Sequence, residues 1–145
     1  MNISDAGLQF IIAHEGMRLK AYPDPATGGE PWTIGVGHTG PEVHPGMTIT
    51  EAQALEYLRD DCKDAEKCLA EHCPGELTQN QFDALVSFIF NVGCGNFKSS
   101  TMAKMINSGD MDGAAQQFAR WNKANKQVMA GLTTRRAHEA QLFQA

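Results

Sequence analysis

One apolar stretch, residues 79–92, constrains the fold of this 145-residue chain more than any other feature. It begins with Thr78-Gln79-Asn80-Gln81, which matches the capping box of a helix, a hydroxyl at the N-cap and a Gln three residues later. Apolar residues then fall on nearly every face of the expected helix, and Gly93 and Gly95 follow as stop signals. A helix without a polar face has to be enclosed, so the sequence predicts a central buried helix in a larger helical region.

The rest of the chain divides into helical patterns and one region rich in turns. A short amphipathic helix is expected over 3–14, and a second capping box, at 50–53, predicts a helix to about residue 70. Shorter helices are expected near 98–107, 111–119 and 133–142, punctuated by Gly109 and Gly131. Residues 16–49 hold most of the Gly and Pro, with short β-like pieces between them. The sequence therefore predicts an α+β fold and a single domain over 1–145, with a small β lobe (16–49) and a helical lobe (1–15 and 50–145).

Charge and hydropathy exclude several classes of function. Lys and Arg number 12 and Asp and Glu 17, so the net charge is −5, which disfavours binding to nucleic acid or to an anionic membrane. No apolar run approaches the roughly 20 residues of a membrane span, so stable membrane insertion is not expected. The first five residues lack the basic and apolar regions of a signal peptide. We therefore expect synthesis in the cytoplasm without an export signal in this sequence.

Two carboxylates in the first part of the chain are candidates for acid–base chemistry. Glu15 is expected at the C-terminal end of the first helix, where the partial negative charge of the helix favours a protonated carboxyl. Asp24 lies between two prolines, a setting typical of a turn. Each residue has a simpler interpretation, a solvated Glu and a turn-forming Asp. Two carboxyls in different environments across a cleft are also the usual equipment for breaking a glycosidic bond.

The segment Thr33-Ile34-Gly35-Val36-Gly37-His38 predicts a tight hairpin with close backbone approach at its glycines. It lacks the third glycine and the following helix of a phosphate-binding motif. The hydroxyl of Thr33 can hold a water molecule, although a packed β-strand residue is the alternative. His38 has the chemistry of a base or a metal ligand, but a structural histidine bonded to a backbone group is favoured, because no neighbouring spacing supports a metal.

Several blocks of the sequence, in order, resemble the phage-type lysozyme family, which includes the lambdoid phage endolysins (glycoside hydrolase family 24). The blocks are EGMRLKAYPD at 15–24, WTIGVGHT at 32–39, QNQFDALVSFIFNVG at 79–93, FKSST at 97–101 and GLTTRRAHEAQLF at 131–143. Together they extend over most of the chain. The resemblance implies a lysozyme-like fold and a catalytic set of Glu15, Asp24 and Thr33. In that family Glu15 would protonate the leaving oxygen, while Asp24 and Thr33 would position water for an inverting reaction.

The resemblance also implies supporting residues. A basic residue of the C-terminal helical region would lie near the acid, either Arg135 or Arg136, with Arg135 favoured. Phe90 and Ser100 match positions that line the substrate cleft, with core packing and helix capping as their respective alternatives. The segment 27–31 is longer than in short family members, and it contains Glu30, a second possible carboxylate. If the added length displaces the following strand, the assignment of Thr33 is affected first and that of Asp24 next.

Four cysteines, at positions 62, 68, 73 and 94, match no common pattern of paired C-x2-C zinc ligands. From the residues alone, buried thiols and disulfides both remain open, with thiols the default for a chain without a signal peptide. An endolysin acts in the oxidising periplasm, so the resemblance favours a bridge between Cys68 and Cys94, with Cys62 and Cys73 as a second and doubtful pair. No metal and no cofactor are expected.

The function expected from the resemblance is that of an endolysin, an N-acetylmuramidase that hydrolyses the β-1,4 bond between N-acetylmuramic acid and N-acetylglucosamine. Its partner would be the peptidoglycan glycan strand, reached in the periplasm after release through a holin pore, and the chain would act as a monomer. A lytic transglycosylase, which forms 1,6-anhydro ends, is one alternative. A catalytically silent glycan-binding module and a toxin or effector domain are the others.

Overall fold

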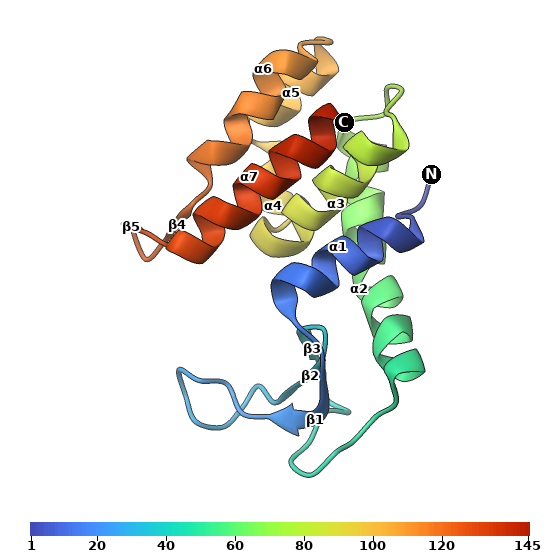
Figure 1. The fold of residues 1–145 in the computed structure, drawn as a ribbon, viewed down its shortest axis with the longest axis vertical. Helices are drawn as coiled ribbons and strands as arrows, with labels where there is room; N and C mark the ends of the chain where they lie inside the picture. The colour runs from blue at the N-terminus through green and yellow to red at the C-terminus, as the bar shows by residue number, and fades with distance from the viewer. The chain divides into compact units, whose positions relative to one another are not determined.

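The computed structural model describes residues 1–145 as seven α-helices, one 3₁₀-helix and five short strands (Figure 1). The helices are α1 (Asp5–Glu15), α2 (Glu51–His72), α3 (Gln79–Val92), α4 (Cys94–Lys98), α5 (Thr101–Asn107), α6 (Met111–Gln117), the 3₁₀-helix η1 (Phe118–Arg120) and α7 (Ala130–Gln144). The strands are β1 (Arg18–Tyr22), β2 (Thr33–Gly35), β3 (His38–Thr39), β4 (Lys123–Ala124) and β5 (Gln127–Val128). This mixture of helices and small sheets confirms the α+β prediction. None of the helices combines the length and the apolar character that crossing a bilayer requires.

The chain forms two compact units. One unit, here called the sheet unit, is Leu8–Lys63. The other, here called the helical unit, combines Met1–Gly7 with Asp64–Ala145. Helices α1 and α2 each contribute residues to both units. The single domain with lobes at 16–49 and at 1–15 plus 50–145 stays a prediction.

The sheet unit is built on a three-stranded antiparallel sheet in the order β1-β2-β3. Strand β1 pairs with β2 through Arg18 opposite Gly35 and Tyr22 opposite Thr33, so β1 bulges between those two pairs. Under the sheet lies a small apolar core of Ala21, Ile34, Val43 and the partly buried Trp32, Met47, Ile49 and Tyr57. The sequence prediction of short strands within 16–49 is confirmed.

The helical unit is organised around α3, which packs along α7 (Figure 1). Every residue from Phe82 to Ile89 is buried, which confirms the predicted central helix. Phe88 makes edge-to-face contacts with Phe97, Phe118 and Trp121, at 5.3–6.3 Å between ring centroids. Such aromatic pairs stabilise a core beyond the apolar area they bury.

Both predicted capping boxes are present. At the start of α3 the Thr78 hydroxyl accepts from the Gln81 amide at 3.1 Å, and the Gln81 side chain accepts from the Thr78 amide at 2.9 Å. The Thr50 hydroxyl accepts from the Gln53 amide at 3.2 Å, and the reciprocal bond is 2.9 Å. These bonds satisfy backbone donors that have no partner inside the helix.

Several predicted boundaries in the C-terminal part were wrong. The helix expected near 98–107 begins only at Thr101, as α5, and a separate short helix, α4, ends at Lys98. The helix expected at 111–119 ends at Gln117 and continues as the 3₁₀-helix η1, and the helix expected at 133–142 extends over Ala130–Gln144. Gly131 therefore lies in the first turn of α7 rather than between elements.

A hairpin formed by β4 and β5 was missed. Its two turn residues, Asn125 and Lys126, have φ of 50° and 65°, the left-handed conformation of a two-residue type I′ turn. Asn at the first turn position is a known signal for this turn, but the usual glycine after it is replaced by Lys. The pattern was therefore too weak to predict from sequence.

The cysteines follow one prediction and contradict the other. Cys68 and Cys94 form the disulfide that the resemblance favoured, with their Cα atoms 5.8 Å apart. Cys62 and Cys73 are both buried and are not joined to each other. Eleven residues separate them along α2, which corresponds to about 16 Å at 1.5 Å per residue. That separation exceeds the Cα distance of about 7 Å that a disulfide allows, so the second predicted bridge was wrong.

Candidate active site

Glu15 is the last residue of α1, where the chain turns at Gly16 with φ of +78°. Its side chain is exposed to solvent. One carboxylate oxygen, Oε2, lies 3.8 Å from the position that a Cβ atom would occupy on Gly37, in the turn between β2 and β3. A side chain at Gly37 would therefore be in van der Waals contact with the Glu15 carboxylate, within the sheet unit.

Asp24 lies in the loop that leaves β1. Its amide donates to the Gly29 carbonyl at 2.9 Å, and its carbonyl accepts from the Thr27 and Gly28 amides at 3.2 and 2.7 Å. Its half-buried carboxylate accepts from the Ala26 amide at 3.2 Å. The turn-forming role expected for an Asp between prolines is therefore present, and one carboxylate oxygen, Oδ1, also accepts a backbone hydrogen bond.

Thr33 opens β2 and is half-buried. It pairs with Tyr22 of β1 on one side and with Thr39 of β3 on the other. Because Tyr22 is two residues before Asp24, this pairing brings the Asp24 loop to the end of β2 where Thr33 lies. The Thr33 hydroxyl donates to the Pro31 carbonyl at 3.4 Å, a long bond that a better acceptor can replace.

The longer segment between β1 and β2 is closed by its own hydrogen bonds. The Thr27 hydroxyl donates to the Glu30 carbonyl at 2.7 Å and accepts from the Gly29 amide at 3.2 Å. Glu30, the second possible carboxylate, is exposed in this segment. The added residues form a local loop, and the pairing of Thr33 with β1 is kept.

His38 lies in β3, and its side chain contacts α2. Its ring is stacked on Tyr57, with centroids 4.0 Å apart and planes 5° from parallel. Nδ1 lies 2.8 Å from an oxygen of Asp61, and Nε2 lies 2.5 Å from an oxygen of Glu42. Both ring nitrogens are engaged by carboxylates, not by the backbone group that was expected. Glu42 and Asp61 were missed as partners because they are 4 and 23 residues away and carry no local motif.

The two carboxylates change the acid–base behaviour of His38. Burial lowers the pKa of His38, but the hydrogen bonds and negative charges of Glu42 and Asp61 outweigh it, so the pKa is raised overall. The hydrogen bond from His38 holds the pKa of Glu42 below its usual value. This arrangement favours a charged imidazolium that ties the sheet to α2, which is a structural role.

Arg135 and Arg136 lie in the helical unit, both buried on α7 around one carboxylate. Arg136 Nε lies 2.7 Å from Glu139 Oε1, and Arg135 Nε donates to Glu139 Oε2 at 3.2 Å. The Ser87 hydroxyl of α3 donates to the same Oε2 at 2.6 Å. Burial raises the pKa of Glu139, against the opposing effects of the two guanidinium groups and Ser87. Glu139 was missed although it lies four and three residues after the arginines on α7, a spacing that pairs charges on one helix. Ser87 was missed because only the packing of α7 on α3 brings it to this cluster.

Ser100 and Phe90 also belong to the helical unit. Ser100 is the N-cap of α5; its buried hydroxyl accepts from the Ala103 amide at 3.1 Å and donates to the Phe97 carbonyl at 2.6 Å. Phe90 is half-buried near the end of α3. Ser100 lines a polar pocket of about 380 Å³ together with Asn96, Ser99, Thr101, Gln117, Arg120 and Trp121. An aromatic ring, amides and a guanidinium are groups that suit a hydroxyl-rich ligand.

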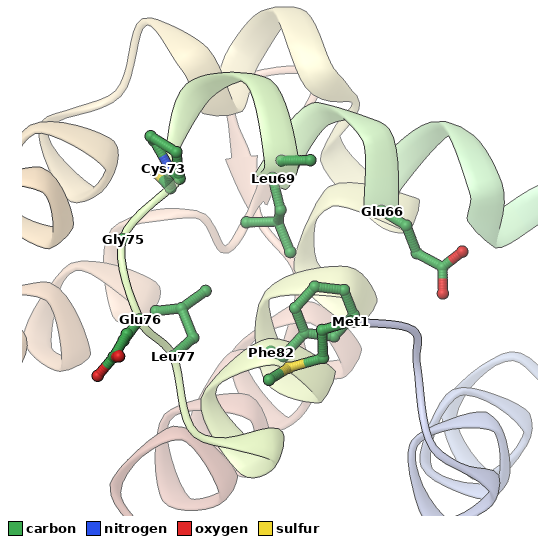
Figure 2. Close-up of a pocket in the computed structure, with 10 residues that line it drawn as sticks. Met1, Glu66, Leu69, Cys73, Gly75, Glu76, Leu77 and Phe82 are labelled. Atoms are coloured by element: carbon green, nitrogen blue, oxygen red, sulfur yellow. The ribbon is translucent and has the colours of Figure 1, made fainter.

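A second pocket of about 550 Å³ lies at the end of α2 and the start of α3 (Figure 2). Its walls are largely apolar, and Leu69, Leu77 and Phe82 contribute side chains to them. Glu66 and Glu76 lie at its edge, where Glu66 also accepts a hydrogen bond from the Ile3 amide at 2.7 Å. None of the predicted catalytic residues lines this pocket, so its volume does not mark it as the active site.

Comparison with known proteins gives consistent matches. Residues 12–139 match the family model described as phage lysozyme. The chain is 45% identical over 143 residues to the endolysin of Bacillus phage B103, with 99% of the chain aligned, and it spans about half (54%) of that relative. The structure of a mutant P22 lysozyme superposes with a TM-score of 0.92 at 40% identity, covering 100% of this chain and 99% of that one. The muramidase domain of SpmX from Asticaccaulis excentricus superposes with a TM-score of 0.89 at 38% identity, covering 99% and 98%.

Proposed function

The chain belongs to the phage lysozyme family, and on that premise we propose that it is an endolysin that cleaves peptidoglycan. The bond cleaved is the β-1,4 linkage between N-acetylmuramic acid and N-acetylglucosamine. The likeness to a muramidase domain over nearly the whole chain supports this substrate class. Glycan strands are the partner, and the reaction needs no metal or cofactor.

Glu15 is the general acid in this proposal, and it donates a proton to the leaving glycosidic oxygen. The observation that carries the assignment is the position of its carboxylate, exposed at the end of α1 beside the side-chain-free Gly37. An acid that protonates a polymer has to be reachable from solvent. His38 is a poorer candidate, because both of its ring nitrogens already lie against carboxylates.

Asp24 and Thr33 position the attacking water. The pairing of Tyr22 with Thr33 supports this assignment, because it holds the chain two residues before Asp24 beside the start of β2. The free Asp24 oxygen is the base, and the weakly bound Thr33 hydroxyl holds the water. Because this water attacks the anomeric carbon from the face opposite the leaving oxygen, the reaction inverts the anomeric configuration.

Two further parts of the proposal concern binding and delivery. The pocket around Ser100 and Trp121 holds part of the glycan strand, and Phe90 adds an apolar surface in the same unit. The enzyme acts as a monomer on the cell wall, and a holin lesion gives it access to the periplasm.

The test replaces Glu15 by Gln, which keeps size and polarity but removes the transferable proton. We expect the rate of hydrolysis of purified peptidoglycan to fall by about 10²–10⁴-fold, while the circular dichroism spectrum stays unchanged. Glu30→Gln is the matched control, an exposed carboxylate in the same unit, and it should keep wild-type activity. Full activity of Glu15→Gln would remove Glu15 as the acid.

Product analysis separates hydrolysis from its alternatives. Mass spectrometry of the released muropeptides should show reducing ends, and NMR of early products should show the inverted anomer. Anhydro ends would instead identify a lytic transglycosylase. Binding without any released fragment would identify a silent glycan-binding module.

A further inference from the structure

Three side chains with metal-ligand chemistry meet in the helical unit, apart from the residues proposed for catalysis. The ligand atoms of Cys68, His72 and Cys94 all lie within 4.8 Å of one another. Cys68 and His72 are one turn apart on α2, so both project from the same face of that helix. Cys94 begins α4 and is held beside Cys68.

We propose that the reduced chain binds a zinc-like divalent cation through Cys68, His72 and Cys94, and that the Cys68–Cys94 disulfide abolishes this site. Two thiolates and an imidazole are ligands that Zn²⁺ prefers. Four-residue spacing on a helix is a common way to present two of them, and a second element commonly supplies the third. The inference does not depend on the proposed enzymatic function.

The backbone positions fit this coordination without rearrangement of the helices. Two sulfurs bound to one zinc ion lie about 3.8 Å apart, given Zn–S bonds of about 2.3 Å and tetrahedral angles. The Cα atoms of Cys68 and Cys94 are 5.8 Å apart, so rotation about their χ1 angles is enough to separate the sulfurs. The same thiolates cannot bind metal and each other, so the two states exclude one another.

The surroundings favour three protein ligands and one from solvent. Cys68 is buried, while His72 and Cys94 are half-buried, so water reaches one side of the cluster and can complete a tetrahedron. The Asn107 side chain donates to the His72 carbonyl at 2.8 Å and ties the end of α2 to α5. This bond fixes the backbone of His72 and involves neither cysteine.

The redox step needs a dithiol reductant. The reductant gives two electrons and two protons to the S–S bond, which breaks to two thiols, while the reductant closes its own disulfide. Zinc then replaces the two thiol protons, which pass to solvent, and the imidazole nitrogen adds its lone pair. In a reducing compartment the chain would carry the metal, and in an oxidising one it would carry the disulfide.

The test uses the full chain, reduced with dithiothreitol and freed of it by anaerobic gel filtration. Titration with Co²⁺ should give thiolate-to-cobalt charge-transfer absorption and tetrahedral visible bands that saturate at one ion per chain. Zn²⁺ should displace the cobalt and raise the melting temperature of the reduced chain. The oxidised chain should show neither absorption, and equal binding by the oxidised chain would contradict the proposal.

Variants locate the metal. His72→Asn leaves both cysteines and should weaken Co²⁺ binding at least tenfold, whereas His44→Asn, an exposed histidine outside the cluster, should leave it unchanged. Zinc should slow alkylation of Cys68 and Cys94 but not of Cys73, as measured by peptide mass spectrometry. Absence of charge-transfer bands, equal affinity of the two histidine variants, or a reduced chain that unfolds and is not restored by Zn²⁺ would each overturn the site.

Discussion

Arg136 and Glu139 lie within one turn of α7, with Nε 2.7 Å from Oε1, and both side chains are at 0% exposure. Glu139 also accepts from Arg135 and from Ser87 of α3. One buried carboxylate is therefore shared between two guanidinium groups and a hydroxyl on the neighbouring helix. Because charges removed from water are costly unless paired, this carboxylate is central to the packing of α7 on α3.

Replacing Glu139 with Gln should destabilise the protein by about 3–5 kcal/mol, because both buried arginines lose their counter-charge. Urea unfolding measures the change. The matched control is Glu71→Gln, which removes the exposed partner of Lys67 at 3.9 Å and should cost less than about 0.5 kcal/mol. Similar losses in the two variants would show that burial does not determine the strength of the Glu139 contacts.

The contacts of His38 should make stability depend on pH in a defined window. Folding raises the pKa of His38 above its ordinary 6.5. The stabilisation of the folded state by the charged imidazolium is therefore fully present below about pH 6.5. The contribution is lost as pH rises through the raised pKa. At low pH the contribution of Glu42, whose pKa is lowered, disappears as that group takes up a proton. The stability difference between wild type and His38→Gln should thus be larger near about pH 6 than near about pH 9.

Urea unfolding of both proteins across this range measures the effect. His44→Gln is the control, an exposed histidine in the same unit whose ring bonds only to the Pro45 carbonyl at 3.0 Å. Its difference from wild type should not vary with pH. A constant difference for His38→Gln as well would contradict the charged-imidazolium interpretation.

Gly37→Ala separates backbone strain from effects on catalysis. Gly37 has φ of +68°, so an alanine there should cost about 1 kcal/mol of stability. The added Cβ would also lie 3.8 Å from Glu15 Oε2 and should lower turnover. Gly46→Ala shares the strain, with φ of +84°, but its Cβ would meet nothing within 4 Å. We expect equal thermal destabilisation and loss of activity in Gly37→Ala alone; an equal loss in both would assign the effect to strain.

The disulfide should stabilise the protein mainly by restricting the unfolded chain. Its ends are 26 residues apart, and a loop of that length corresponds to about 3–4 kcal/mol in the chain-entropy model. Cys68→Ser combined with Cys94→Ser should lower the free energy of unfolding by that amount, measured with a chelator present to exclude metal. Cys73→Ser alters a buried thiol outside the bridge, so it should keep the wild-type difference in stability between oxidising and reducing conditions.

The sequence by itself determined the elements whose signals are local. The capping boxes at Thr50 and Thr78 fixed the starts of α2 and α3, since each box is completed within four residues. The absence of a polar face predicted that α3 is buried, and the glycines between β2 and β3 predicted the hairpin. The family resemblance favoured the bridge between Cys68 and Cys94, which is present, while the catalytic roles of Glu15, Asp24 and Thr33 stay predictions.

Only the tertiary structure decided which side chains meet. Asp61 meets His38, and Ser87 of α3 meets Glu139 of α7, because strands and helices pack side by side, and no spacing in the sequence encodes that approach. The same reason explains why Cys94 of α4 was not expected beside His72, which lies one turn from Cys68 on α2. Helix ends and turns depend on contacts within a few residues, whereas charge clusters depend on the relative position of whole elements, which is set by burial of their apolar faces.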